Sequence, residues 1–244
     1  MDKVIYLKAI MPEVSGYKIA DIFNRKYQEK ETVSKSFVYD IFRKHQYAIL
    51  LERSNIKNKK PYSVAPNKVW GIDLTGKQDS KKTNHHIFAI VEHNSRANLA
   101  LESIKNKTSL LLLKQIIKAI EVYGKPKAIR TDNDIVFTSK FFKFGMWLLN
   151  IQHQTIDPGC PWQNGRVERF FGTLKNKLNR IIINDSKHLQ LHLTDFRFWY
   201  NHVRTHLNLD GKTPGEVWSN KSIKKQSFFY SQWGGLLQGY WHPT

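Results

Sequence analysis

The sequence predicts an α/β protein that is preceded by a small helical domain. Two observations support this fold class: five apolar segments of strand type follow residue 66, and amphipathic helical segments separate or follow the later ones. The first 50 residues, in contrast, show only short helical patterns. With 244 residues, of which 41% are hydrophobic, the chain can bury one large core or two small ones.

A helix-turn-helix-like segment is expected within residues 1–50. Its first helix covers residues 17–24, and residues 32–34 offer an N-cap for a second helix over residues 35–45. The basic side chains of the second helix lie off its apolar face: Lys35, Arg43 and Lys44. Such a pair of helices is compatible with reading the major groove of DNA, and the alternative is a small bundle that only packs on the main domain.

Residues 51–66 are expected to form a linker, because Pro61 and Pro66 do not fit inside a helix. The lysines of this stretch favour a path along phosphate groups. An ordinary solvated connector explains them equally well.

The main domain is expected over residues 67–185. Its strand-type segments are residues 68–74, 85–91, 97–104, 127–131 and 151–156. Thr108 can cap a helix over residues 110–123, which Gly124 ends, and Ser139 can cap a helix over residues 140–149. A further helix follows a turn near Gly165. Residues 186–244 are expected to be a C-terminal extension, helical over residues 191–206, with an aromatic-rich tail.

The charge of the chain indicates a nucleic-acid partner. The formal net charge is +19 and the isoelectric point is near 9.9. Basic residues exceed acidic ones in every region, which suits a protein that lies on nucleic acid over a broad area. Solubility alone would explain a smaller excess.

Several other classes of protein are disfavoured. Cys160 is the single cysteine, which excludes an internal disulfide framework. No stretch reaches the roughly 18 apolar residues of a membrane span, and no signal peptide begins the chain. Two histidine pairs have helical spacing, but no close acid accompanies them, so zinc is not expected at either: His188 with His192, and His202 with His206. His202, Arg204 and His206 are expected to brace either the core or the DNA.

Three acids in separate segments are candidates for one metal site. Asp73 lies inside an apolar strand, where an isolated carboxylate is costly unless it is paired, protonated or bound to a metal. Asp132 follows another strand, and Asp134 is a less well placed alternative to it. Glu168 lies near the start of a helix, where the helix dipole favours a carboxylate whatever its function. Such acids can converge on Mg²⁺ or Mn²⁺, and two ions can clamp a phosphodiester.

The motifs around these acids carry a family resemblance. The segment 161–175 reads Pro-Trp-Gln-Asn-Gly-Arg-Val-Glu-Arg-Phe-Phe-Gly-Thr-Leu-Lys, and 35 residues separate Asp132 from Glu168. Both features resemble the Asp-Asp-Glu transposases of bacterial insertion sequences, whose core is similar to that of retroviral integrases. Segments 200–206 and 211–218 are similar to the usual sequel of that core, so the resemblance covers roughly residues 67–218.

The resemblance implies a ribonuclease H-like core with a mixed five-stranded sheet and flanking helices. It implies that Asp73, Asp132 and Glu168 hold two Mg²⁺ or Mn²⁺ ions and that Lys175 contacts the terminal DNA of the element. Further DNA contacts are expected from residues around this helix: Asn164, Arg166, Arg169 and Lys177. Trp162 is expected either to pack in the core or to stack on a base. Ser95-Arg96 matches a recurrent pair of the family, with a structural or phosphate-binding role.

The implied activity is cleavage of DNA at the ends of an element and transfer of the freed 3′-hydroxyl to target DNA. The protein would act as a homo-oligomer on DNA, in the bacterial cytoplasm and associated with the nucleoid. One alternative is a catalytically inactive DNA-binding remnant or regulator, against which the intact acids argue. Another is a nuclease for RNA–DNA hybrids. Many relatives carry an additional helix-turn-helix segment before the region that begins here, and its loss would predict weak binding to the ends.

Overall fold

The computed structural model describes residues 1–243 except 28–29, 58–63, 157–163 and 222–224. The chain forms two compact units, Met1–Tyr62 and Ser63–Thr244. Among the described residues, no helix is both long and apolar enough to cross a membrane.

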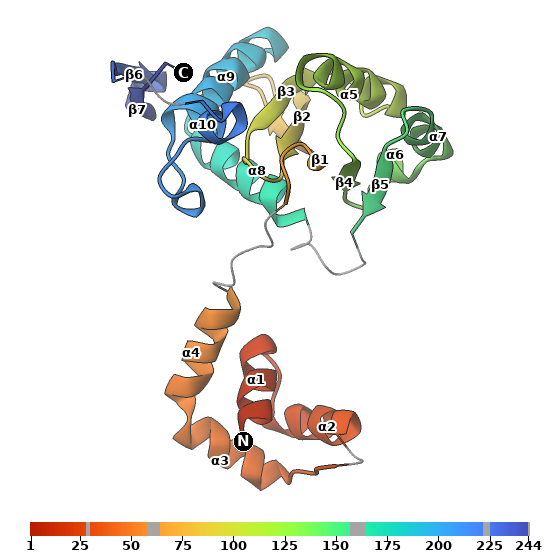
Figure 1. Ribbon diagram of the computed structural model, residues 1–244, viewed down its shortest axis with the longest axis vertical. Coiled ribbons are helices and arrows are strands. Elements are labelled where there is room, and N and C mark those ends of the chain that lie inside the picture. The colour runs from red at the N-terminus through yellow and green to blue at the C-terminus, as the bar shows by residue number, and fades with distance from the viewer. Residues whose placement is uncertain (28–29, 58–63, 157–163, 222–224, 244) are drawn as a thin grey trace. The chain divides into compact units, whose positions relative to one another are not determined.

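The first unit is a bundle of four helices (Figure 1): α1 (Asp2–Ile10), α2 (Gly16–Tyr27), α3 (Lys35–Lys44) and α4 (Gln46–Lys57). Its core is formed by side chains from all four helices, including Val4, Ile19, Phe23, Val38 and Ile49. Ser34 caps α3 as expected, because its hydroxyl accepts a hydrogen bond of 3.1 Å from the Phe37 amide. The sequence predicted α2 and α3. It did not predict α1, because the apolar residues of that helix do not form a stripe along one side.

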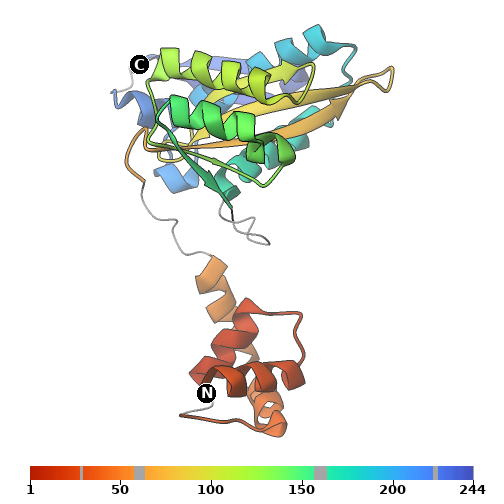
Figure 2. The same cartoon turned by 90° about the vertical axis from the view of Figure 1, so that its right-hand side faces the viewer.

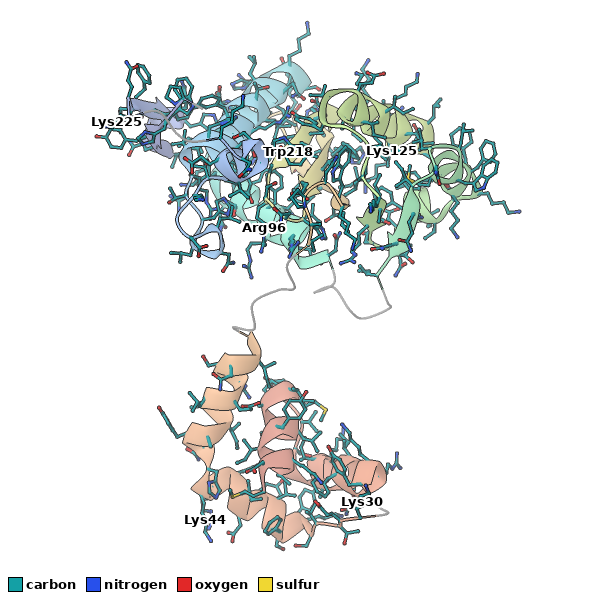
Figure 3. The ribbon with its side chains drawn as sticks, viewed as in Figure 1. Lys30, Lys44, Arg96, Lys125, Trp218 and Lys225 are labelled. Carbon is teal, nitrogen blue, oxygen red and sulfur yellow. The ribbon has the colours of Figure 1, made fainter. Side chains whose placement is uncertain are left out.

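Two features of this unit differ from the expectation. The helix α4 runs to Lys57, into the stretch that was predicted as a linker from residue 51; residues 58–63 lie outside the described part of the chain. Residues 30–34, which precede α3, are not helical, so the connection from α2 is longer than the 3–4-residue turn of a helix-turn-helix. On α3, the predicted DNA contacts Lys35, Arg43 and Lys44 are all exposed, and Lys44 is labelled in Figure 3.

The second unit is built on a five-stranded mixed sheet: β1 (Val69–Gln78), β2 (Asn84–Glu92), β3 (Asn98–Ile104), β4 (Ala128–Thr131) and β5 (Gln152–Thr155). The strand order is β3-β2-β1-β4-β5. β2 runs antiparallel to both β1 and β3, whereas β4 runs parallel to both β1 and β5. This arrangement confirms the predicted fold class, and each predicted strand exists within a few residues of its predicted bounds.

Helices cover both faces of the sheet (Figure 2). One face packs against α5 (Ser109–Tyr123), α6 (Ile135–Thr138) and α7 (Lys140–Leu148), and the other against α8 (Gly165–Leu178) and α9 (Ser186–Phe198). The caps predicted for α5 and α7 are confirmed, since Thr108 and Ser139 accept hydrogen bonds from backbone amides of the first turn. In β1, Trp70 and Ile72 are buried on the α5 face. Because side chains alternate along a strand, Asp73 points to the α8 face.

The C-terminal extension packs into the same core as α8. After α9 come a π-helical turn η2 (Trp199–Val203), a short 3-10 turn η3 (Leu207–Leu209) and α10 (Pro214–Ser219). A two-stranded hairpin ends the chain: β6 (Phe228–Gln232), a 3-10 turn η4 (Trp233–Gly235) and β7 (Leu237–Trp241). Leu237 is fully buried among residues of α8 and α9, and the Trp199 indole donates a hydrogen bond to the Gln238 carbonyl at 3.0 Å. The aromatic tail therefore stabilises the face of the sheet that carries α8.

Candidate active site

Asp73 and Asp132 lie side by side because two parallel strands hold them in register. The pairing of β1 with β4 aligns Val69 with Ala128 and Gly71 with Arg130. Continued by two residues, the same register places Asp132, just beyond the end of β4, beside Asp73. The Asp132 carboxylate accepts a hydrogen bond of 3.1 Å from the Asp134 amide, and the Asp73 carboxylate accepts one of 2.7 Å from the Leu74 amide.

Glu168 joins these two acids because the start of α8 packs against β1. Asn164, directly before the helix, is buried, and its amide lies 3.5 Å from the Ile72 carbonyl. A Cβ atom on Gly71 would lie only 3.1 Å from the Asn164 side-chain oxygen, so glycine allows this close approach. Glu168 follows Asn164 by four residues and therefore lies on the same side of the helix, over β1.

Electrostatics connects the three acids. The pKa of Asp73 is raised to about 6, mainly by burial, against the Leu74 hydrogen bond that lowers it. The negative charges of Asp132 and Glu168 add to the rise, whereas the positive charge of Lys175 opposes it. All four residues are therefore near neighbours. Lys175 lies seven residues after Glu168 and is exposed on the same side of α8.

The chemistry of this group suits a hard divalent cation. Carboxylate oxygens are the ligands that Mg²⁺ and Mn²⁺ prefer, and a cation relieves the repulsion among three negative side chains. In the observed side-chain conformations, no three His, Cys, Asp or Glu residues of the described part of the chain lie close enough to hold one ion. Glu168 is exposed, and rotation about its side-chain bonds changes its distance from Asp73.

Asp134 has a separate role as a helix cap. Its carboxylate accepts a hydrogen bond of 3.1 Å from the Val136 amide, and its φ of −57° is ordinary. Asp134 thereby fixes the start of α6 and the loop that carries Asp132.

Two predicted DNA contacts are turned inward. Asn164 is 1% exposed and packs on β1. The Lys177 ammonium donates a hydrogen bond of 2.8 Å to the Leu236 carbonyl and lies over the Trp199 ring, so Lys177 holds the C-terminal hairpin to α8. That either residue contacts DNA stays a prediction. Trp162 and Gln163 lie outside the described residues.

Arg166 and Arg169 line a cavity on the neighbouring side of α8. Its volume is about 220 Å³, and its lining comes from α8, the turn after β2 and the segment after α9: Arg96, Arg166, Arg169, Thr173, Tyr200, Arg204, Thr205, His206, Leu207 and Asn208. We call this cavity the arginine pocket. Arg96 lies beside α8 in Figure 3. Arg204 lies in the segment 200–206, whose sequence is similar to the usual sequel of the core.

Comparison with known proteins identifies the family. Two family models, both described as integrase core domains, match residues 63–161 and 149–214. The chain belongs to the integrase core family. The family resemblance and the ribonuclease H-like core expected from the sequence are thereby confirmed.

Relatives of this integrase core chain come from bacterial insertion elements and retroviruses. The IS476 uncharacterized 39.2 kDa protein of Xanthomonas euvesicatoria is 25% identical over 189 residues, which cover 74% of this chain and 55% of that protein. The Gag-Pro-Pol polyprotein of human T-cell leukemia virus 2 is 31% identical over 155 residues, covering 63% of this chain and 10% of the polyprotein. The chain thus spans about half the length of the insertion-element relative.

A solved structure shares the fold. The catalytic core domain of HTLV-2 integrase, in a trimeric form in complex with magnesium, matches with a TM-score of 0.51 and 27% sequence identity. The match covers 64% of this chain and 99% of that domain. The matched integrase core thus accounts for most of the second unit of this chain.

Proposed function

We propose that this chain is a transposase that cuts DNA at the ends of an insertion element and transfers the freed 3′-hydroxyl to target DNA. The observation that carries the proposal is the register of β1 and β4, which sets Asp73 beside Asp132, with Glu168 above them on α8. Membership of the integrase core family and the insertion-element relatives support the same activity.

In this proposal, Asp73, Asp132 and Glu168 hold two Mg²⁺ or Mn²⁺ ions. When bound, such ions activate the attacking oxygen and stabilise the charge that develops on the phosphodiester. The strands fix two of the acids through the backbone, whereas Glu168 adjusts from the exposed side of α8. Lys175 lies on the same side and pairs with the backbone of the DNA end. That a related integrase core was solved with magnesium supports this choice of ion.

The proposed reaction consists of two displacements at phosphorus. Water first attacks the phosphodiester at the end of the element and releases a 3′-hydroxyl. That hydroxyl then attacks a phosphodiester of the target and displaces its 3′ oxygen, so one phosphodiester bond forms for each that breaks. Two ends must be joined, so we propose that the protein acts as a homo-oligomer on DNA, in the bacterial cytoplasm at the nucleoid.

The decisive experiment compares the wild type with Glu168→Gln in an assay of end cleavage and joining with Mg²⁺. We expect the variant to lose both reactions while it binds the DNA ends with nearly unchanged affinity. Asp134→Asn is the matched control: it removes a neighbouring acid but retains the capping oxygen, so activity should persist.

Three outcomes would contradict the proposal. Normal joining by Glu168→Gln would exclude the acid triad. Binding without any cleavage or joining by the wild type would indicate a DNA-binding regulator. Digestion of RNA–DNA hybrids without strand transfer would indicate a nuclease.

A further inference from the structure

The arginine pocket concentrates positive charge in a small space. Four guanidinium groups line it, those of Arg96, Arg166, Arg169 and Arg204, and no carboxylate is part of its lining. The hydroxyl groups of Thr173, Thr205 and Tyr200 and the Asn208 amide also line the cavity. Guanidinium and hydroxyl groups are hydrogen-bond donors, so the cavity is built to receive acceptors.

One acid of the described residues lies close to this charge. Among those residues, only the charge of Glu92, which is fully buried, reaches both Arg96 and Arg166. Its carboxylate already accepts hydrogen bonds from the Ser95 amide and the Ser95 hydroxyl, each at 2.6 Å. In the described part of the chain, Arg169 forms no side-chain hydrogen bond or ion pair.

Neutral groups also contact the arginines and hold them in place. Arg166 donates a hydrogen bond to the His93 carbonyl. Arg204 lies over the Tyr200 ring and donates a hydrogen bond of 2.7 Å to His206. Burial and the nearby arginines lower the pKa of His206 to about 3, so its ring is neutral and accepts this bond at neutral pH. The Arg96 Nε is buried and has no hydrogen-bond partner among the residues that the structure describes.

Two of the arginines that line the pocket have unusual backbone conformations at or next to them. Arg96 has a φ of +64°, in the left-handed region that a non-glycine residue seldom occupies. Arg204 ends the π-helical turn η2, where its amide bonds to the Trp199 carbonyl at 2.8 Å. Such turns are frequent at functional sites, since they redirect the side chains that follow.

We propose that the arginine pocket binds one backbone phosphate of the DNA strand that the acid triad cuts or joins. The inference rests on the proposed function and adds an anchoring site to it. Arg166, Arg169 and Thr173 recur at helical spacing on one side of α8, whereas Glu168 and Lys175 lie on the adjacent side. A strand that crosses α8 can thus place one phosphate at the acids and another in the pocket.

A phosphodiester fits this pocket better than other anions. It offers two unesterified oxygens to several guanidinium groups at once, and arginine binds such oxygens with paired hydrogen bonds. Gly172 lies on the exposed side of α8, and a Cβ atom there would have no neighbour within 4 Å inside the described chain. This surface leaves room for a nucleic-acid backbone beside the pocket.

The test is a scan of single phosphates. Oligonucleotides with the sequence of the element end, and separate target oligonucleotides, carry one neutral methylphosphonate at successive positions. Binding is measured without divalent ions for the full-length wild type and for Arg169→Gln. We expect one position to weaken wild-type binding by about tenfold and to have no effect on the variant. Whether that position lies in the end or in the target identifies the strand.

A second measurement asks whether the arginines share one phosphate. The dependence of log K on the logarithm of salt concentration should become shallower by about one in Arg169→Gln. The slope of the double variant Arg169→Gln/Arg204→Gln should be shallower by the same amount. If the two arginines contacted two different phosphates, the slope of the double variant would instead be shallower by about two. Lys114→Gln, on the opposite face of the sheet, is the control for loss of one charge.

The outcomes separate this inference from the proposed function. We call a position silent when its methylphosphonate weakens binding of the wild type but not of Arg169→Gln. If Glu168→Gln blocks joining but no position is silent, the pocket is not a phosphate site and the proposed activity stands. If a silent position exists but Glu168→Gln joins DNA normally, the pocket stands as a DNA site and the proposed activity falls. Binding of free inorganic phosphate, with no silent position in either strand, would overturn the DNA assignment.

Discussion

Glu168 and Arg169 are consecutive residues of α8 that face two different sites. Glu168 lies close enough to Asp73 for its charge to raise the pKa of that carboxyl. Arg169 lines the arginine pocket with Arg96 and Arg204. Successive residues of an α-helix point about 100° apart, so one helix presents a negative side and a positive side. The proposed cleavage chemistry and the proposed phosphate anchor are thereby fixed relative to each other by a rigid element.

Asp73→Asn should stabilise the protein above pH 6. The folded pKa of about 6 exceeds the ordinary value of 3.8, so the folded chain binds this proton more tightly than the unfolded chain. The charge therefore costs stability as the pH rises through that window, and the cost vanishes below about pH 4. We expect a gain of up to about 3 kcal/mol at pH 8 and none at pH 3.5, measured by thermal unfolding.

The same experiment, repeated with Mg²⁺, tests whether Asp73 binds the metal ion. Mg²⁺ should raise the melting temperature of the wild type above pH 6 and leave that of Asp73→Asn unchanged. An equal gain in stability for the variant at both pH values would show that ionisation of Asp73 is not the cause.

Lys175→Gln should weaken binding to the DNA end. Lys175 is exposed on the side of α8 that carries Glu168, and its charge lowers the pKa of Asp73. We expect the slope of log K against log salt to fall by about one and the pKa of Asp73 to rise further. Fluorescence anisotropy over a salt series measures the slope, with Lys114→Gln as the control. Identical slopes for the two variants would remove Lys175 from the interface.

Asp134→Ala should destabilise the protein by about 0.5–2 kcal/mol through loss of a helix cap. Asp134→Asn should retain most of the stability, since its side-chain oxygen can still accept the Val136 amide hydrogen bond. Urea denaturation compares the two variants. The ion pair with Lys107, at 3.9 Å and partly exposed, should contribute little. A similar loss in both variants would mean that charge, not capping, is the important interaction.

Leu237→Ala should cost about 2–5 kcal/mol, because the side chain is fully buried between the C-terminal hairpin and the helices α8 and α9. Phe229→Ala is the matched control in the same hairpin: Phe229 is 63% exposed, and its truncation should change stability by less than about 0.5 kcal/mol. Urea denaturation distinguishes them. Equal effects would show that the hairpin does not contribute to the core.

Arg96→Gly should weaken DNA binding without loss of stability. Its left-handed backbone costs a non-glycine residue about 1 kcal/mol or more, and glycine removes that cost. Arg96→Ala removes the same guanidinium but keeps the strained backbone, so it should be the less stable of the two variants. We expect equal losses of DNA affinity from both, measured beside their melting temperatures. Unimpaired binding by either variant would show that Arg96 does not contact DNA.

Local patterns predicted the elements of the second unit well. Thr108 and Ser139 cap helices where expected, and the apolar run around Ile72 predicted a strand at Asp73. The burial of Asn164 and the hydrogen bond of Lys177 to Leu236 were not predictable, because both depend on which surface packs against α8. The hairpin at residues 228–241 was also not predictable from the sequence, since it is stabilised by packing on α9.

The sequence by itself determined the fold class, the family and the three acids, because periodicity, capping and motif spacing are local properties of the chain. Only the tertiary structure decided which charged side chains face one another. The register of β1 against β4 aligns Asp73 with Asp132 across more than fifty residues of sequence. The packing of the segment after α9 against α8 brings Arg204 to Arg169. Burial and strand pairing act between distant segments, so no local pattern encodes them.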